Sequence, residues 1–110
     1  MNEYVKLSIK KEIGYIEFFH PQSNALPANI LTKLAQTISD AGKNDEIKVI
    51  VLGSGGERAF CAGASFDELT NISNEEEGKK FFSGFANVIN ACRKCPKFII
   101  GRIQGKAVGG

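Results

Sequence analysis

The chain has 110 residues, of which 43% are hydrophobic and 24% are charged, and its formal net charge is +2. This length fits one modest globular unit and is too short for two. Basic and acidic residues are spread along the chain without a long basic run, which argues against nucleic acid as a partner. No long apolar stretch and no basic N-terminal region followed by an apolar block occur, so we expect neither a membrane span nor a secretion signal.

Three cysteines are an odd number and do not suggest a disulfide framework. A cytoplasmic location is therefore the expectation. Cys92 and Cys95 have redox or zinc spacing, but a structural zinc site needs four ligands, and only Cys61 and His20 remain to complete one. We interpret Cys92 and Cys95 as core residues at a helix end, and we expect no metal site.

The N-terminal part predicts a strand hairpin followed by a helix. Residues 5–9 alternate apolar and polar, and residues 12–19 are rich in β-branched and aromatic side chains. The helix should begin near Pro27, because the missing N–H of proline is tolerated in a first helical turn. Gly42 is the expected stop. Apolar residues recur at helical spacing between them: Ile30, Leu31, Leu34, Ile38 and Ala41.

Two apolar runs predict further strands. The run 47–52 ends at Gly53 and is nearly continuous, which is typical of a strand buried on both faces. The run 98–103 is interpreted in the same way. The order strand, strand, helix, strand indicates an α/β domain.

A second long helix is expected between these runs. Ser73 and Glu76 have the spacing of a capping box, and the acidic residues 75–77 suit the first turn of a helix. Cys95 and Pro96 should end it. The apolar stripe of this helix is interpreted as core: Phe81, Phe82, Phe85, Ile89 and Cys92.

The loop of residues 53–65 is the first candidate site, because open α/β sheets contact ligands in loops that follow buried strands. Residues 65–69 can open a helical turn, so unpaired backbone N–H groups should collect near Ala64. Such groups bind a developing negative oxygen without side-chain chemistry when they are fixed beforehand. The segment 59–64 therefore has the features of an oxyanion hole built from small residues.

Other chemistry fits this loop less well. It has neither the Walker A sequence nor the dinucleotide fingerprint, so a phosphate cradle and a plain flexible connection stay as alternatives. Ser65 as a nucleophile would need His20 as its base, but its surroundings do not match a nucleophile elbow. Asp67 and Glu68 could be paired catalytic carboxylates, yet neighbouring residues of a helical turn point in different directions, which favours capping acids.

Two glycine segments resemble the oxyanion-hole motifs of the crotonase (enoyl-CoA hydratase/isomerase) family and occur in the family's order. The segment 59–64 is similar to the one in which the alanine after the glycine supplies the first N–H, here Ala64. The segment 105–110 is similar to the second motif, in which the middle glycine supplies the other N–H, here Gly110. The resemblance implies that these two residues stabilise the oxygen of an enolate.

The segment 20–26 resembles the family's early turn, which lies along the adenosine end of coenzyme A. The family usually has aspartate where this chain has Ser65, a change on which a backbone N–H does not depend. Lys97, Arg102 and Lys106 could lie near coenzyme A phosphates or be ordinary surface residues. The substrate-binding residues that the resemblance implies are Ser23, Ala25, Gly63, Ala64, Ser65, Phe66 and Asp67.

For the fold, the resemblance implies a crotonase-like spiral of strand-strand-helix units, with residues 1–110 as the N-terminal portion of a single acyl-CoA-binding domain. Relatives are longer and carry their catalytic glutamates after the position of Gly110. We therefore expect a truncated chain, inactive by itself, whose full-length parent forms a homotrimer or a dimer of trimers.

For function, the resemblance implies binding of an acyl-CoA thioester, with hydration of a 2-enoyl-CoA in fatty acid metabolism as the expected reaction. Coenzyme A is part of the substrate, so no separate cofactor is expected. Isomerisation, thioester hydrolysis and decarboxylation use the same type of oxyanion hole and stay as alternatives. A further hypothesis is a non-catalytic acyl-CoA-binding or assembly fragment.

Overall fold

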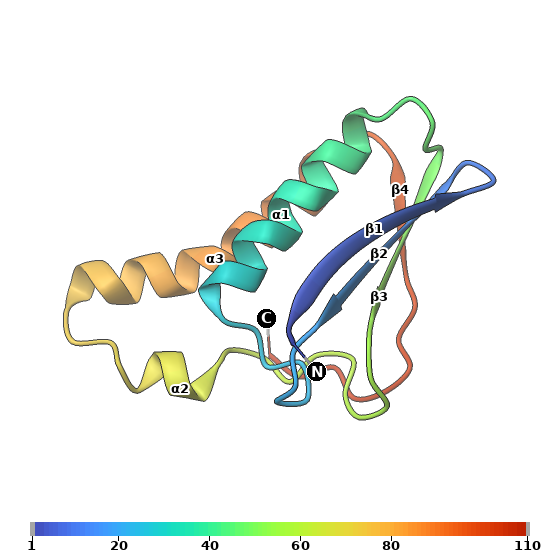
Figure 1. Ribbon diagram of the computed structural model, residues 1–110. Coiled ribbons are helices and arrows are strands. Elements are labelled where there is room, and N and C mark those ends of the chain that lie inside the picture. Colours follow the sequence, from blue (N-terminus) through green and yellow to red (C-terminus); the bar gives the residue numbers. More distant parts are fainter. Residues whose placement is uncertain (1, 110) are drawn as a thin grey trace.

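The computed structural model describes residues 2–109 and shows one sheet with long helices on one of its faces (Figure 1). The α/β class predicted from the sequence is confirmed. The elements in chain order are β1 (Tyr4–Lys10), β2 (Ile13–Phe19), α1 (Ala28–Lys43), β3 (Val49–Ser54), α2 (Phe66–Leu69), α3 (Glu75–Lys94) and β4 (Phe98–Gly101).

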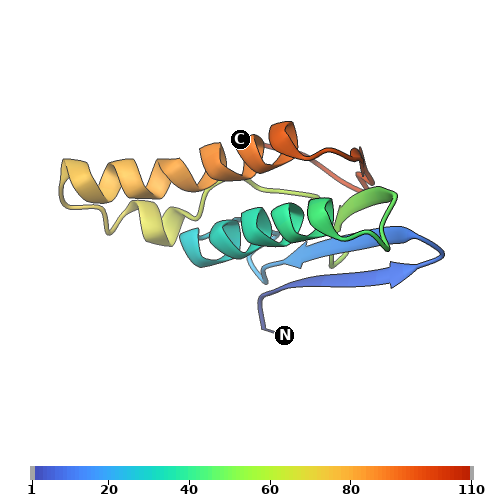
Figure 2. The same ribbon diagram turned by 90° about the horizontal axis from the view of Figure 1, so that it is seen from above.

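Strand order in the sheet follows chain order, β1-β2-β3-β4. The strands β1 and β2 form the predicted antiparallel hairpin, whereas β2, β3 and β4 are parallel to one another. Each parallel connection contains a long helix, and α1 and α3 lie side by side over the same face (Figure 2). The carboxyl ends of the three parallel strands therefore meet at one edge, where ligands bind in open α/β sheets.

The core lies between the sheet and the two long helices. Strand alternation turns Gly14, Ile16 and Phe18 of β2 toward the helices, and these residues are buried. Burying one large apolar side chain stabilises the fold by about 1.5–3 kcal/mol. The largest fully buried side chains are Ile16, Leu31, Ile38, Ile47 and Ile50.

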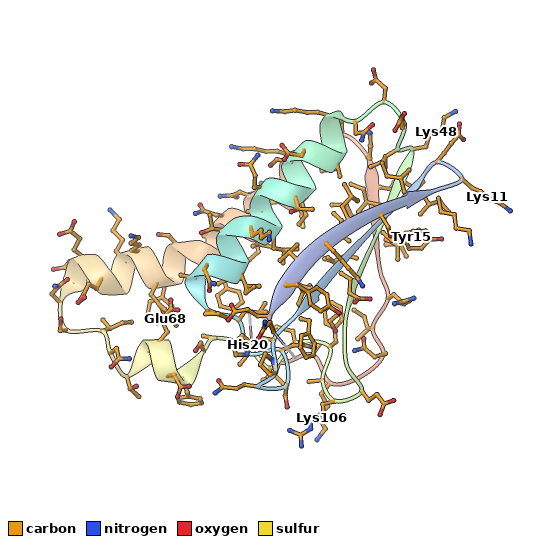
Figure 3. All side chains as sticks on the ribbon, in the orientation of Figure 1. Lys11, Tyr15, His20, Lys48, Glu68 and Lys106 are labelled. Carbon is orange, nitrogen blue, oxygen red and sulfur yellow. The ribbon has the colours of Figure 1, made fainter. Side chains whose placement is uncertain are left out.

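The opposite face of the sheet is partly open, and here one prediction is wrong. Tyr15 points away from α1 and α3 (Figure 3), as its place in the strand alternation requires. The strand β4 was expected to be buried, but Phe98 is 83% exposed and Ile100 is 55% exposed. Only Ile99 of this strand packs against the core. Within residues 2–109, helices cover just one face, so alternate residues of β4 face outward.

The helix α1 follows Pro27, as predicted, but it does not stop at Gly42. It runs to Lys43, and Gly42 is buried inside it. A Cβ at Gly42 would lie 3.2 Å from both Cys95 Sγ and Pro96 Cδ. The glycine is therefore explained by close packing against the end of α3 rather than by helix termination.

The helix α3 begins one residue later than the predicted capping box. Its N-cap is Asn74, whose side chain accepts a hydrogen bond from the Glu77 N–H at 2.8 Å. Ser73 instead donates its hydroxyl to the Glu77 carboxylate at 2.6 Å. Cys95 is the C-cap, as expected from the following proline.

The predicted apolar stripe of α3 is partly wrong. Phe81 is buried, and Phe85 and Cys92 pack against the core, but Phe82 and Ile89 are exposed. The helix approaches α1 through small residues, because a Cβ on Gly84 would lie 2.9 Å from Leu31 Cδ1. Because α3 contacts α1 at Gly84, the buried face of α3 is the one that contains Phe81 and Gly84, and Phe82 lies on its solvent-facing side. The face that packs on the core also contains Val88, Ala91 and Cys95.

Candidate functional site

The two glycine-containing segments lie side by side at the carboxyl edge of the sheet. The N–H groups of Phe60 and Cys61 both donate to the Lys106 carbonyl, at 2.9 and 3.2 Å. The Val108 N–H donates in turn to the Cys61 carbonyl at 2.9 Å. These bonds form a short parallel pairing between residues far apart in the sequence.

Gly105 allows this pairing to be close. A Cβ at Gly105 would lie 2.4 Å from the Arg58 carbonyl oxygen and 3.4 Å from Ala59 Cα. The first distance is far below van der Waals contact, and its partner is backbone that cannot rotate away. Residues 58–61 can therefore approach residues 105–108 only if position 105 has no side chain.

Gly63 and Gly109 bring the ends of the two segments together. Their φ angles are +89° and +76°, in the left-handed region that glycine adopts readily. A Cβ on Gly109 would lie 3.1 Å from Gly63 Cα, and a Cβ on Gly63 would lie 3.3 Å from the Val108 carbonyl oxygen. The structure thus places residues 63 and 109 against each other, whereas the predicted oxyanion hole itself stays a prediction.

The early turn of residues 20–26 pairs with the other side of the same loop. The Ala62 N–H donates to the Asn24 carbonyl at 3.1 Å, and the Leu26 N–H donates to the Gly63 carbonyl at 2.8 Å. The Ser65 N–H donates to the Leu26 carbonyl at 3.3 Å. All three segments predicted to form the site therefore lie together at one edge.

Among the residues that the structure describes, this arrangement leaves the backbone N–H of Ala64 without an acceptor. Ala64 and Leu26 form an isolated parallel bridge, in which the bonds use the Gly63 carbonyl and the Ser65 N–H. Within residues 2–109, no backbone carbonyl accepts from the Ala64 N–H. Because Ala64 is only half-buried, this N–H can donate to a ligand oxygen. Gly110, predicted to supply the second donor, lies outside the described residues.

Ser65 and the short helix α2 complete the loop. Ser65 is 4% exposed and is the N-cap of α2, with its side chain accepting from the Glu68 N–H at 3.4 Å. The predicted helical turn is confirmed. Phe66 is exposed, and Asp67 accepts a hydrogen bond from Gln22 Nε2 at 3.0 Å. Of the substrate contacts predicted here, the Ser65 hydroxyl is thus engaged in capping, whereas Phe66 faces outward.

Asp67 and Glu68 do not form a carboxylate pair. Glu68 reaches the start of α1 and accepts from the Ala28 N–H with both carboxylate oxygens at 3.1 Å (Figure 3). Because α1 has no side-chain cap of its own at Pro27, Glu68 supplies the missing acceptor at the positive end of that helix. The interpretation as capping acids therefore fits Glu68, which caps α1 rather than its own turn, whereas the Asp67 carboxylate binds Gln22 and caps no helix.

Ser23 borders a small hollow next to the loop, whereas Ala25 lies in the same turn but does not line the hollow. Ser23 has a left-handed φ of +56°, and Arg58 Nη1 lies 3.5 Å from its hydroxyl oxygen. The Ala25 N–H donates to the Gln22 carbonyl at 3.1 Å. A cavity of about 190 Å³ lies between this turn and residues 55–58. The exposed side chains of Arg58 and Glu57 place one positive and one negative charge at this hollow.

An apolar cavity lies on the core side of the paired loops. Its volume is about 200 Å³, and it extends between the sheet and the two long helices. Cavities with this lining bind hydrocarbon groups rather than water. Its lining includes Leu34, Phe60, Cys61, Phe85, Val108 and Gly109.

The cysteines are free thiols. Cys61 is half-buried beside the cavity, and burial raises the pKa of its thiol, an effect that a hydrogen bond from the Gly63 N–H partly offsets. Burial also raises the pKa of the Cys92 thiol, with a smaller contribution from Cys95. Both thiols therefore stay protonated and unreactive near neutral pH. In the described part of the chain, no group of three or more histidine, cysteine or acidic side chains is placed to hold a metal ion.

The three basic residues considered for phosphate binding are not together. Lys97 lies at the opposite end of the sheet and donates to the carbonyls of Ala41 and Asn44, where it caps the carboxyl end of α1. Arg102 packs against Gly53, whose Cβ would lie 3.4 Å from the guanidinium Nε. Lys106 is exposed and lies at the edge that carries the loops (Figure 3).

Asn24 is a site residue that the sequence did not single out. It is 2% exposed and connects the early turn to the loop through three side-chain hydrogen bonds. The available signal was an asparagine in a turn that follows a proline, since asparagine tolerates a left-handed backbone. That signal predicts a turn but not a buried amide, which only the tertiary structure shows.

The fold is an α/β sheet whose glycine-containing loops meet at its carboxyl edge, the edge at which open α/β sheets bind ligands. The enoyl-CoA hydratase/isomerase family matches residues 8–110. A solved enoyl-CoA hydratase/carnithine racemase from Magnetospirillum magneticum has a TM-score of 0.86 and is 25% identical, covering 96% of this chain and 40% of that chain. The chain belongs to the enoyl-CoA hydratase/isomerase, or crotonase, family.

Individual relatives match it over part of their length. A protein of Bacillus subtilis (strain 168) named "putative enoyl-CoA hydratase/isomerase YngF" is 31% identical over 114 residues, which cover 100% of this chain and 43% of YngF. The short-chain-enoyl-CoA hydratase of Clostridium acetobutylicum is 30% identical, covering 96% of this chain and 41% of that protein. The ethylmalonyl-CoA decarboxylase of Xenopus laevis is 30% identical, covering 79% of this chain and 29% of that protein. The chain thus spans less than half the length of these relatives. No helix within the described residues is long and apolar enough to cross a membrane.

Proposed function

We propose that this protein binds an acyl-CoA thioester and holds the thioester oxygen on the backbone N–H groups of Ala64 and Gly110. The observation that carries the proposal is the contact between the Gly63 and Gly109 loops beside the free Ala64 N–H. Hydration of a 2-enoyl-CoA is the reaction that we propose for the protein, in keeping with its family and with the hydratase among its relatives.

The chemistry of the proposed step is charge stabilisation. When a nucleophile adds to the β-carbon of an enoyl thioester, negative charge moves to the carbonyl oxygen as an enolate forms. A fixed N–H that points at this oxygen stabilises the enolate more than the neutral thioester, and removing one such donor typically lowers kcat by about 10²–10³-fold. The paired loops are held by backbone hydrogen bonds on both sides, which supports a preorganised donor at Ala64.

The surrounding contacts suit the remaining parts of the ligand. Ser23 borders the hollow beside Arg58, whose positive charge suits the anionic coenzyme A moiety, and Ala25 belongs to the same turn. Phe66 and Asp67 face outward from the loop next to Ala64 and could contact the ligand. On the other side of the paired loops, the apolar cavity offers a lining suited to an acyl group.

Proton transfer is not assigned to any residue among 2–109. Hydration needs an acid and a base, and each positioned group contributes roughly 10²–10⁴-fold. Asp67 and Glu68 are the acidic residues nearest to Ala64 in the sequence, but both are engaged in hydrogen bonds, with Gln22 and with the start of α1. In this proposal, residues 2–109 therefore bind and polarise the thioester. Whether the reaction is hydration or isomerisation depends on the groups that transfer the proton.

Decarboxylation is the second candidate reaction, because it also forms a thioester enolate and one relative is an ethylmalonyl-CoA decarboxylase. A non-catalytic assembly role is a candidate of a different class. It is favoured by the exposed apolar side chains of β4 and the segment after it, Phe98, Ile100 and Ile103, which suit contact with further polypeptide. For the acyl-CoA-binding protein, we also propose a cytoplasmic location and assembly of the full-length chain as a homotrimer or a dimer of trimers.

Binding of butyryl-CoA with an isotope-labelled thioester carbonyl tests the proposal. This saturated thioester cannot be hydrated, and hydrogen bonds to its oxygen lower the carbonyl stretching frequency in the infrared spectrum. We expect the intact natural protein to lower this frequency. Gly63→Pro should abolish the shift, because proline cannot adopt the φ of +89° found at Gly63.

Gly78→Ala is the matched control, since Gly78 lies in α3, away from the loops. This variant should keep the full shift. Self-association without any binding of butyryl-CoA would contradict the proposal and favour the assembly role. Two activity measurements separate hydration from decarboxylation: turnover of a 2-enoyl-CoA reports hydration, and release of carbon dioxide from a 2-carboxyacyl-CoA reports decarboxylation.

A further inference from the structure

The side chain of Asn24 is buried and uses its amide group on three backbone partners. Nδ2 donates to the carbonyl oxygens of Gly55 at 3.0 Å and Ala59 at 2.8 Å, and Oδ1 accepts from the His20 N–H at 2.7 Å. Because both partners of Nδ2 are acceptors and the partner of Oδ1 is a donor, only one orientation of the amide satisfies all three bonds. One side chain therefore joins the early turn to both ends of the segment 55–59.

The backbone of Asn24 continues this connection toward Ala64. Its carbonyl accepts from the Ala62 N–H at 3.1 Å, and its own N–H donates to the His20 carbonyl at 3.0 Å. Its φ is +62°, in the left-handed region that asparagine tolerates better than most residues. The Asn24 carbonyl thus holds the Ala62 N–H, and the Asn24 side chain fixes the position of that carbonyl.

We propose that Asn24 is a positioning residue that fixes the direction of the Ala64 N–H, an inference that rests on the proposed function of this N–H. Asn24 does not reach the ligand oxygen. It acts through Ala62, two residues before Ala64, and through the parallel bridge between Leu26 and Ala64 that follows in register. An N–H donor stabilises an enolate best when its direction is set before the reaction. A loosened loop should therefore reduce the polarisation of the thioester carbonyl more than it reduces the affinity for the acyl-CoA.

Asn24→Gly is the variant that isolates the amide group. Glycine keeps the left-handed backbone but removes all three side-chain hydrogen bonds. We expect the intact protein with this substitution to bind butyryl-CoA within about threefold of the unsubstituted affinity and to lose most of the infrared shift of the thioester carbonyl. With a 2-enoyl-CoA, kcat should fall by about 10²-fold, the size of one lost oxyanion donor, with little change in KM.

Ile38→Val is the matched control for a general loss of stability. Ile38 is fully buried in α1 and contributes to the core rather than to the loops. This variant should keep the infrared shift and kcat, although it also lowers stability. An Asn24→Gly protein that folds and retains the full shift would overturn the inference, as would an equal loss of shift in Ile38→Val.

If Asn24→Gly does not fold, Asn24→Ser provides the test. A serine hydroxyl cannot bond both Gly55 and Ala59, so we expect a partial loss of the shift and faster amide hydrogen exchange at Ala62. An unchanged shift together with unchanged exchange would contradict the positioning role. Absence of any shift in the unsubstituted protein would instead refute the proposed function, and with it this inference, so that the two failures are distinguishable.

Discussion

Gly63 and Gly109 contact each other through their backbones, and a Cβ on Gly109 would lie 3.1 Å from Gly63 Cα. Both residues have left-handed φ angles. They end two segments that are separated by more than forty residues in the sequence but joined by hydrogen bonds in the fold. The contact brings the residue after Gly63, the donor Ala64, close to the second glycine segment, and the site that we propose depends on it.

Gly105→Ala should separate the two segments. The new Cβ would lie 2.4 Å from the Arg58 carbonyl oxygen, so backbone must move, and we expect a loss of about 3 kcal/mol in the free energy of unfolding. Urea denaturation measures this change. Gly101→Ala is the control, because its Cβ would meet mainly the flexible Ile103 side chain at 3.2 Å. Equal stability of the two variants would show that the close pairing is unimportant.

Two glycines of α3 should respond in opposite directions to alanine. Gly84→Ala places a Cβ 2.9 Å from Leu31 Cδ1 and should destabilise the protein by about 1–2 kcal/mol, because α1 and α3 must move apart. Gly78→Ala meets only Ile72, at an ordinary 3.6 Å, and should stabilise it by about 0.5–1 kcal/mol through helix propensity. Thermal unfolding of both variants tests the pair. A destabilising Gly78→Ala would contradict the packing described for α3.

Glu68→Ala should destabilise α1 even though residue 68 lies far from it in the sequence. The carboxylate accepts from the Ala28 N–H, and loss of an N-terminal acceptor of this kind costs about 0.5–2 kcal/mol. Hydrogen exchange of the first-turn amides of α1 should accelerate. Glu46→Ala removes an exposed acid in the turn after α1 and serves as the control. Similar exchange in both variants would exclude a capping role for Glu68.

The Tyr4 phenol should lose its proton at a higher pH than an ordinary tyrosine. A hydrogen bond to Glu17 at 2.5 Å, burial and the charge of that carboxylate raise the pKa of Tyr4 to about 12. Because the folded pKa exceeds the ordinary value of about 10, the contact stabilises the fold fully below pH about 10, and this contribution is lost as the pH rises toward 12. Tyrosinate absorbance measures the titration.

Glu17→Gln is the informative comparison for this prediction. It removes the carboxylate charge and should lower the pKa of Tyr4 toward about 10. Tyr4→Phe identifies which absorbance change belongs to Tyr4 rather than to Tyr15. An unchanged Tyr4 titration in Glu17→Gln would contradict the assigned cause.

Much of the fold could be predicted from the sequence, and the location of the site stays a prediction. Strand alternation in residues 5–19 predicted the hairpin, and helical periodicity predicted α1, because these patterns report which side of an element is buried. The glycine segments predicted loops near Ala64, because small residues directly after buried strands are typical of loops at the carboxyl edge of an α/β sheet. Boundaries were less accurate, as Gly42 and the Ser73–Glu76 box show.

The tertiary structure decided which distant groups meet. Side-chain contacts across the sequence, such as Glu68 with Ala28 and Asn24 with Gly55, leave no local period, so no window of sequence reveals them. Exposure of Phe98 was also mispredicted, because a strand's burial depends on what packs on each face rather than on its own apolar residues. Thus the sequence determined the elements and the loop chemistry through short-range propensity and periodicity. Only the packing of β-α-β units placed Gly63 against Gly109 and left the Ala64 N–H without an acceptor in the described part of the chain.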